Sequence, residues 1–102
     1  MSGTSADGIS AAAVRFDASG EKPSATLLAY HEQPYVSAQR ERLLRALDGA
    51  SLAKLSRLDF ELGAWLADAA LAVIGNAGLV PREVRAIASH GHTIWHLSLI
   101  HI

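Results

Sequence analysis

Residues 8–35, GISAAAVRFDASGEKPSATLLAYHEQPY, decide the fold because they contain two apolar runs with one turn signal between them. The first run, 8–16, is short and apolar and ends on Val-Arg-Phe, which predicts a strand. Residues 17–24 concentrate Asp, Ser, Gly and Pro, as hairpin turns do. The second run, 25–35, predicts a returning strand that stops at Pro34, because proline cannot donate a ladder hydrogen bond. We therefore expect an antiparallel hairpin.

Two helices are predicted after the hairpin. Residues 37–49 place Leu43, Leu44 and Leu47 on one face and end at Gly49, a typical C-terminal cap. Ser51 is a suitable N-cap for a longer helix, which the sequence GNAG at 75–78 ends. Apolar residues recur in it at steps of three and four, namely Leu52, Leu55, Leu58, Leu62, Trp65, Leu66, Ala69 and Val73. This stripe predicts an amphipathic helix that packs on one side.

A third strand is predicted over residues 84–91, VRAIASHG, after a polar link at Pro81. The expected order is strand, strand, helix, helix, strand, which favours an α/β architecture with a mixed sheet. Three strands leave both edges of such a sheet open. We therefore expect part of a sheet rather than a complete one.

Composition narrows the class of protein. The chain has 102 residues, enough for one small domain, and a formal net charge of −1. That charge provides no basic field for nucleic acid and no polybasic patch for a membrane. The chain has no cysteine, which excludes disulfides and thiolate metal sites and fits a cytoplasmic location. The first residues do not form a signal peptide, and no apolar run is long enough to cross a bilayer.

The opening residues 1–10, MSGTSADGIS, have the composition of an anion-binding loop. Gly3 and Gly8 permit tight turning and close approach of a ligand, and a row of main-chain N–H groups with hydroxyls beside it can bind phosphate. Asp7 adds a carboxylate that suits a hydrated Mg²⁺. The stretch is not a Walker A loop, because the Gly-Lys-Ser/Thr ending is missing. The alternative is an ordinary turn, since Asp-Gly is common in hairpins.

Three stretches together resemble the anhydro-N-acetylmuramic acid kinases: MSGTSADGI at 1–9, LDFELGAWLADAA at 58–70 and SHGHTIWH at 89–96. The resemblance implies part of the N-terminal lobe of an actin-like, ribonuclease H-like ATPase fold, within the superfamily of sugar kinases and actin. It also implies an enzyme that uses ATP and Mg²⁺ to open the 1,6-anhydro bond of anhydro-N-acetylmuramic acid and phosphorylate O6. The product would be N-acetylmuramic acid 6-phosphate, in the recycling of cell-wall peptidoglycan.

The resemblance also implies the site. The ATP-phosphate loop comprises Gly3, Thr4, Ser5, Ala6, Asp7, Gly8, Ile9 and Ser10, with Asp7 as the metal ligand. The sugar cleft is lined by Ser89, His90, Gly91, His92 and Thr93. The family usually has an acid at position 10 and Gln at position 92, so Ser10 and His92 depart from its pattern. The family's catalytic Asp lies downstream of the sugar motif, so we assign no general base and expect this chain alone to be inactive.

The expected partners are therefore the amino sugar and ATP, with a homodimer for the whole protein and neither nucleic acid nor a membrane. We expect residues 1–96 to be a partial N-terminal lobe and residues 97–102 to be a non-native tail. Two alternatives remain. His90, His92 and His96 are candidate zinc ligands, because neutral imidazoles bind Zn²⁺. A non-catalytic α/β module that binds a partner through its open sheet edge is the other.

Overall fold

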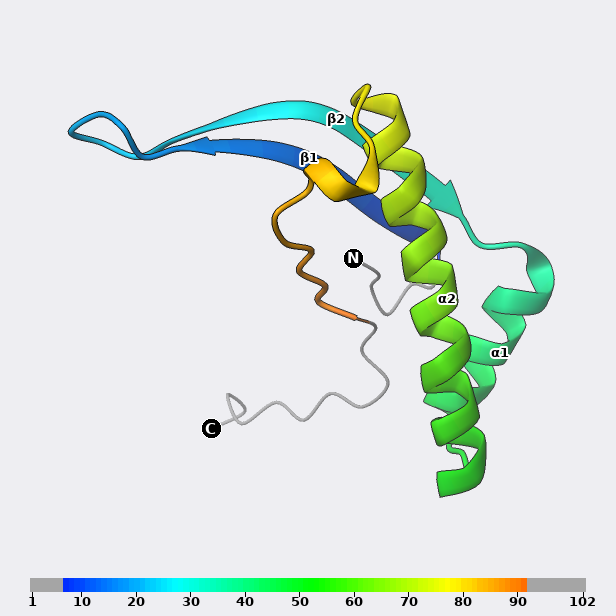
Figure 1. The fold of residues 1–102 in the computed structure, drawn as a ribbon. Helices are drawn as coiled ribbons and strands as arrows, with labels where there is room; N and C mark the ends of the chain where they lie inside the picture. Colours follow the sequence, from blue (N-terminus) through cyan, green and yellow to red (C-terminus); the bar gives the residue numbers. More distant parts are fainter. Residues whose placement is uncertain (1–6, 92–102) are drawn as a thin grey trace, which may run out of the picture.

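A computed structural model describes residues 7–91 of the chain (Figure 1). These residues form one two-stranded antiparallel sheet, two α-helices and one 3₁₀ helix. In chain order the elements are β1 (Gly8–Asp17), β2 (Ser24–Pro34), α1 (Ser37–Leu47), α2 (Leu52–Asn76) and η1 (Pro81–Glu83). The hairpin and both helices confirm the predictions for the first three-quarters of the chain.

The hairpin changes register once along its length. Asp17 pairs with Ser24 beside the turn, and Gly8 pairs with Pro34 at the open end. The shift lies between Ala13 and Val14 of β1, where Leu28 of β2 is left without a partner. Such a bulge increases the local twist of a strand pair. It also moves every pair beyond it by one residue.

Local signals begin and end the helices as the sequence predicts. Ser51 caps α2, since its hydroxyl accepts a hydrogen bond from the main-chain N–H of Lys54 (3.2 Å). Gly49 follows α1 with φ 121°, and Gly78 follows α2 with φ 75°. Both values are in the region that glycine adopts without steric cost, so each helix stops where the next residue needs that freedom.

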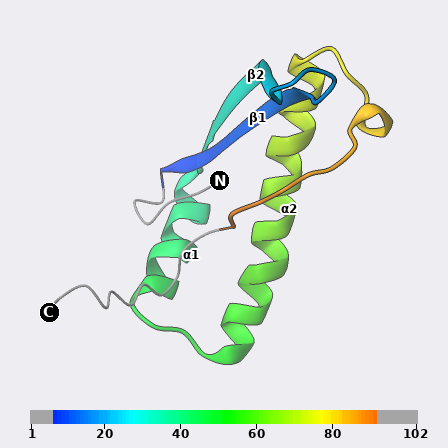
Figure 2. The same ribbon diagram turned by 90° about the vertical axis from the view of Figure 1, so that its left-hand side faces the viewer.

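Helix α2 covers one face of the hairpin and contacts both strands (Figures 1 and 2). Alternate residues of a strand point to the same face, and Ile9 is the most deeply buried residue of β1, with 2% exposure. From α2, the residues Ala69, Val73 and Ile74 are buried. This layer fixes the end of the hairpin at which β1 begins.

A second part of the core lies where α1 packs beside α2 (Figure 2). Its buried residues are Leu43, Ala46 and Leu58, and partly buried Tyr35, Leu44, Leu55 and Trp65 pack against them. An ion pair between Arg42 and Glu61 bridges the two helices at the surface. The two helices therefore form an antiparallel pair with its own apolar contact.

Three details of the predictions are wrong. Residues 84–91 form no strand, although Val84 is extended (φ −86°, ψ 121°), because no described strand lies beside them to pair. The described sheet is consequently antiparallel rather than mixed. Leu52 is 86% exposed, because it is the first residue of α2 and lies outside the packed part of the helix pair. The α/β class with an incomplete sheet is confirmed and is consistent with the N-terminal part of an actin-like ATPase fold.

Candidate functional site

Asp7 and Gly8 lie at the entry to β1, and their main chain is closely held. The main-chain N–H of Tyr35 donates a hydrogen bond to the carbonyl oxygen of Asp7 (3.0 Å). At Gly8 a Cβ atom would lie only 2.6 Å from the carbonyl oxygen of Gln33 and 2.9 Å from Cα of Pro34. Position 8 therefore requires glycine because β2 passes too close for any side chain. The carboxylate of Asp7 remains exposed.

The next two residues of the predicted phosphate loop belong to the sheet. Ile9 is in the core, so only its main chain is available to a ligand. Ser10 is half-buried and pairs with Glu32 of β2. Sequence reasoning placed both in the loop. The structure assigns them instead to the strand that supports it.

Ser89 and Gly91 form a tight turn within the predicted sugar-binding segment. The hydroxyl oxygen of Ser89 accepts a hydrogen bond from the main-chain N–H of Gly91 (3.0 Å), and Gly91 has φ 75°. His90, between them, is exposed. After η1 the chain runs back from the far end of α2 toward the end of the hairpin where β1 starts (Figures 1 and 2). Both predicted site segments thus approach the same end of the hairpin.

Six of the predicted site residues lie outside the described residues: Gly3, Thr4, Ser5, Ala6, His92 and Thr93. His96, the third histidine of the alternative zinc site, lies outside them as well. Across residues 7–91, no group of three or more His, Asp or Glu side chains is placed to hold a metal ion. A single exposed carboxylate at Asp7 still fits Mg²⁺, which is usually held through one or two carboxylates together with substrate phosphates.

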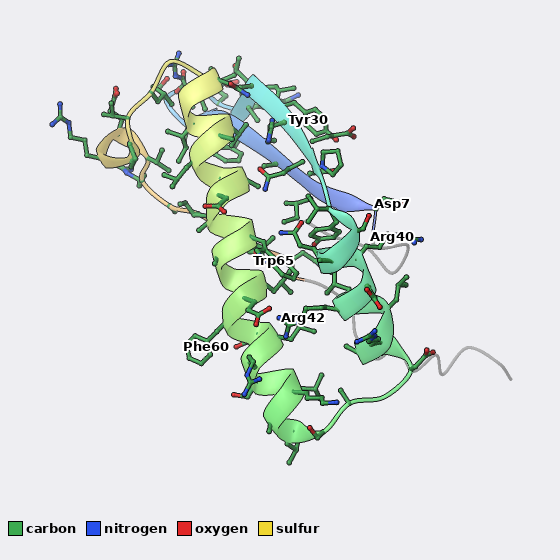
Figure 3. All side chains as sticks on the ribbon, turned by 90° about the vertical axis from the view of Figure 1, so that its right-hand side faces the viewer. Asp7, Tyr30, Arg40, Arg42, Phe60 and Trp65 are labelled. Atoms are coloured by element: carbon green, nitrogen blue, oxygen red, sulfur yellow. The ribbon has the colours of Figure 1, made fainter. Side chains whose placement is uncertain are left out.

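A shallow groove of about 320 Å³ runs along the outer face of α1. Its lining residues are Ser37, Arg40, Glu41, Leu44, Arg45 and Asp48. Figure 3 shows Arg40 on the part of α1 nearest to Asp7. The two arginines are balanced by two carboxylates, and Arg45 pairs with Glu41. The groove therefore has no net charge that would concentrate an anionic ligand.

Sequence reasoning missed Tyr35 and Trp65 as neighbours of the site. Their rings meet edge to face, with centroids 5.8 Å apart and an interplanar angle of 62°. Trp65 was assigned to the core of the long helix, and Tyr35 was assigned only to the end of a strand. Their contact joins the entry to β1 to the helix pair, because Tyr35 also holds Asp7. The placement of an aromatic residue directly after Pro34 was the available signal.

No helix within the described part of the chain is both long enough and apolar enough to cross a membrane. The two unpaired outer edges of the described hairpin leave the partner-binding alternative as a prediction.

Comparison with known proteins connects these residues to one family. The family model described as anhydro-N-acetylmuramic acid kinase matches residues 1–101. The anhydro-N-acetylmuramic acid kinase of Caldanaerobacter subterraneus subsp. tengcongensis is 37% identical over 99 residues, covering 95% of this chain and 25% of the relative. Its counterpart in Xanthomonas campestris pv. campestris is 43% identical over 99 residues, covering 94% and 26%. That of Vibrio vulnificus is 36% identical over 98 residues, covering 94% and 25%. The chain spans about a quarter of the length of these curated relatives.

Proposed function

Because this chain belongs to the anhydro-N-acetylmuramic acid kinase family, we propose that it forms part of an enzyme that phosphorylates anhydro-N-acetylmuramic acid. Water adds to the anomeric carbon and opens the 1,6-anhydro bond, while the γ-phosphoryl group of ATP is transferred to O6. The products are N-acetylmuramic acid 6-phosphate and ADP. The observation that carries this proposal is the family match over residues 1–101.

Residues 3–10 bind the phosphates of ATP through main-chain N–H groups and hydroxyls. The close approach of β2 to Gly8 and the hydrogen bond from Tyr35 to Asp7 support this role, since both fix the exit of the loop. The exposed carboxylate of Asp7 holds Mg²⁺ through bound water. When bound, that ion offsets the negative charge of the phosphates during transfer. Ile9 contributes only through its main chain.

Residues 89–93 line the sugar cleft. The turn at Ser89 and Gly91 supports this role, because a glycine with positive φ lets the main chain come close to a ligand. The hydroxyl of Ser89 accepts from Gly91 and keeps its own proton for donation to a sugar oxygen. The imidazole of His90 is exposed and can donate or accept.

The chain alone is inactive in this proposal because it holds no general base. Phosphoryl transfer and bond opening require a group that takes a proton from the attacking water. The acids of α2 nearest the family-like stretch, Asp59 and Asp68, are exposed on the helix and far from either predicted segment in sequence. The cytoplasmic location, the homodimer and the tail at 97–102 stay predictions.

The test is a transplant into an active relative. Residues 1–96 replace the matching segment of the Xanthomonas campestris kinase, and transfer of radiolabelled phosphate from ATP to anhydro-N-acetylmuramic acid is measured. We expect the chimera to be active and the 102-residue chain alone to be inactive. Asp7→Asn in the chimera should reduce kcat/KM at least roughly tenfold, because the metal ligand loses its charge. A folded chimera without phosphotransfer activity would contradict the proposal, and activity of the chain alone would contradict its inactivity.

A further inference from the structure

The exit of the predicted phosphate loop is fastened to β2 at two consecutive residues. Asp7 accepts the hydrogen bond from the main-chain N–H of Tyr35, one residue beyond the end of β2. Gly8 lies against the main chain of Gln33 and Pro34 with no space for a side chain. The path of the chain into β1 is therefore set by the position of β2 at residues 33–35.

The ring of Tyr35 is in turn held by the helix pair. It meets the ring of Trp65 at 5.8 Å, and both rings pack against the buried cluster of Leu43, Ala46 and Leu58. Figure 3 shows Trp65 on α2, on the side that faces α1, with Asp7 at the start of β1 beyond it. Both side chains are only half-buried, so the contact lies at the edge of the core rather than inside it.

The bond to Asp7 comes from the main chain of Tyr35, so most substitutions at position 35 keep the donor. What the ring decides is where that donor lies. Edge-to-face aromatic pairs have a preferred geometry, and the pair therefore restricts the rotation and translation of the main chain at residue 35. A loop held in its binding geometry before the ligand arrives loses less entropy when the ligand binds.

We propose that the Tyr35–Trp65 pair is a positioning element for the nucleotide-phosphate loop and couples that loop to the packing of α1 on α2. The inference rests on the proposed function, because it assumes that residues 3–10 bind ATP. Tyr35 and Trp65 touch neither the nucleotide nor the sugar. They act through the carbonyl of Asp7, and binding of MgATP changes the environment of the Trp65 indole.

The experiment uses the 102-residue chain carrying Trp95→Phe, which leaves Trp65 as its single tryptophan. MgATP is titrated, with the dissociation constant taken from calorimetry and the Trp65 emission recorded in parallel. Tyr35→Leu keeps an apolar side chain but removes the aromatic edge. We expect it to weaken MgATP binding roughly fivefold, the equivalent of one aromatic pair, and to abolish the change in Trp65 emission. Tyr35→Phe keeps the ring and should keep both the affinity and the emission change.

Val73→Ala is the matched control for stability. Val73 is buried between α2 and the hairpin, away from the aromatic pair. The variant should lower the unfolding midpoint and leave the dissociation constant for MgATP unchanged. A merely structural role for the pair predicts instead that affinity follows stability in all variants. If Tyr35→Leu does not fold, Trp65→Leu tests the same contact from the other helix.

The outcomes separate this inference from the proposed function. MgATP binding by the unaltered chain with equal affinity in folded Tyr35→Leu overturns the inference and leaves the nucleotide role standing. Equal weakening in Val73→Ala also overturns it. If the unaltered chain has no affinity for MgATP, the nucleotide role fails, and the inference fails with it.

Discussion

Gly8→Ala should destabilise the chain because the added methyl group has no space. Its carbon would lie 2.6 Å from the carbonyl oxygen of Gln33 and 2.9 Å from Cα of Pro34, and both atoms belong to the main chain of β2. Flexible side chains can move aside, whereas here the strand pair itself must separate. Forcing an extra methyl group into a packed site costs about 1–3 kcal/mol. For a domain of this size that loss lowers the thermal midpoint by roughly 5–20 °C.

Gly63→Ala is the matched control, since it adds the same methyl group on the exposed side of α2. No atom lies within 4 Å of its Cβ position. Alanine favours the helix over glycine, so this variant should gain about 0.5–1 kcal/mol. Thermal and urea unfolding, followed by circular dichroism, measure both changes. If Gly8→Ala is as stable as the unaltered chain, or if both variants shift in the same direction, the close approach of β2 at Gly8 is refuted.

Three further predictions test other contacts. Leu43→Ala should lower the free energy of unfolding by about 2–5 kcal/mol, because Leu43 is fully buried between the helices, and a loss under about 1 kcal/mol in urea unfolding would contradict that packing. Ser51→Ala should cost about 1 kcal/mol in the same assay, because the N–H of Lys54 loses its acceptor, whereas Ser51→Gly should cost only a few tenths. The hydroxyl and then the main-chain N–H of Ser19 hold the pKa of Asp17 below its ordinary 3.8, so Ser19→Ala should raise that pKa in an NMR titration. Since a lowered carboxyl pKa stabilises the fold above pH 3.8, this contribution is lost as the pH falls through the folded pKa, and an unchanged pKa in Ser19→Ala would contradict the assignment.

Local patterns predicted the elements that need no distant partner. The hairpin follows from one turn signal between two apolar runs, and α2 follows from Ser51 and a stripe of three- and four-residue steps. The strand over residues 84–91 was predicted from composition alone, yet a strand exists only when another strand accepts its hydrogen bonds. Leu52 fits the helical stripe but lies outside the packed part of α2, because periodicity indicates a face and not the length over which a neighbour covers it.

The candidate site was predicted as a set of residues but not as an arrangement. The family resemblance pointed to the loop before β1, and it assigned Ile9 to the ligand although the strand buries its side chain. The tether between Asp7 and Tyr35 was not predicted. The two residues are 28 positions apart, and a hairpin brings such residues together only in one register.

That register depends on the bulge at Leu28. If the pairing beside the turn, where Asp17 lies opposite Ser24, continued unchanged along the hairpin, Asp7 would lie opposite Pro34. Proline has no main-chain N–H, so the carbonyl of Asp7 would face a residue that cannot donate to it. The extra residue in β2 shifts the pairing by one and brings Tyr35 opposite Asp7 instead. A one-residue irregularity in the sheet thus supplies both the hydrogen-bond donor that holds the loop exit and the aromatic ring that joins it to the helices.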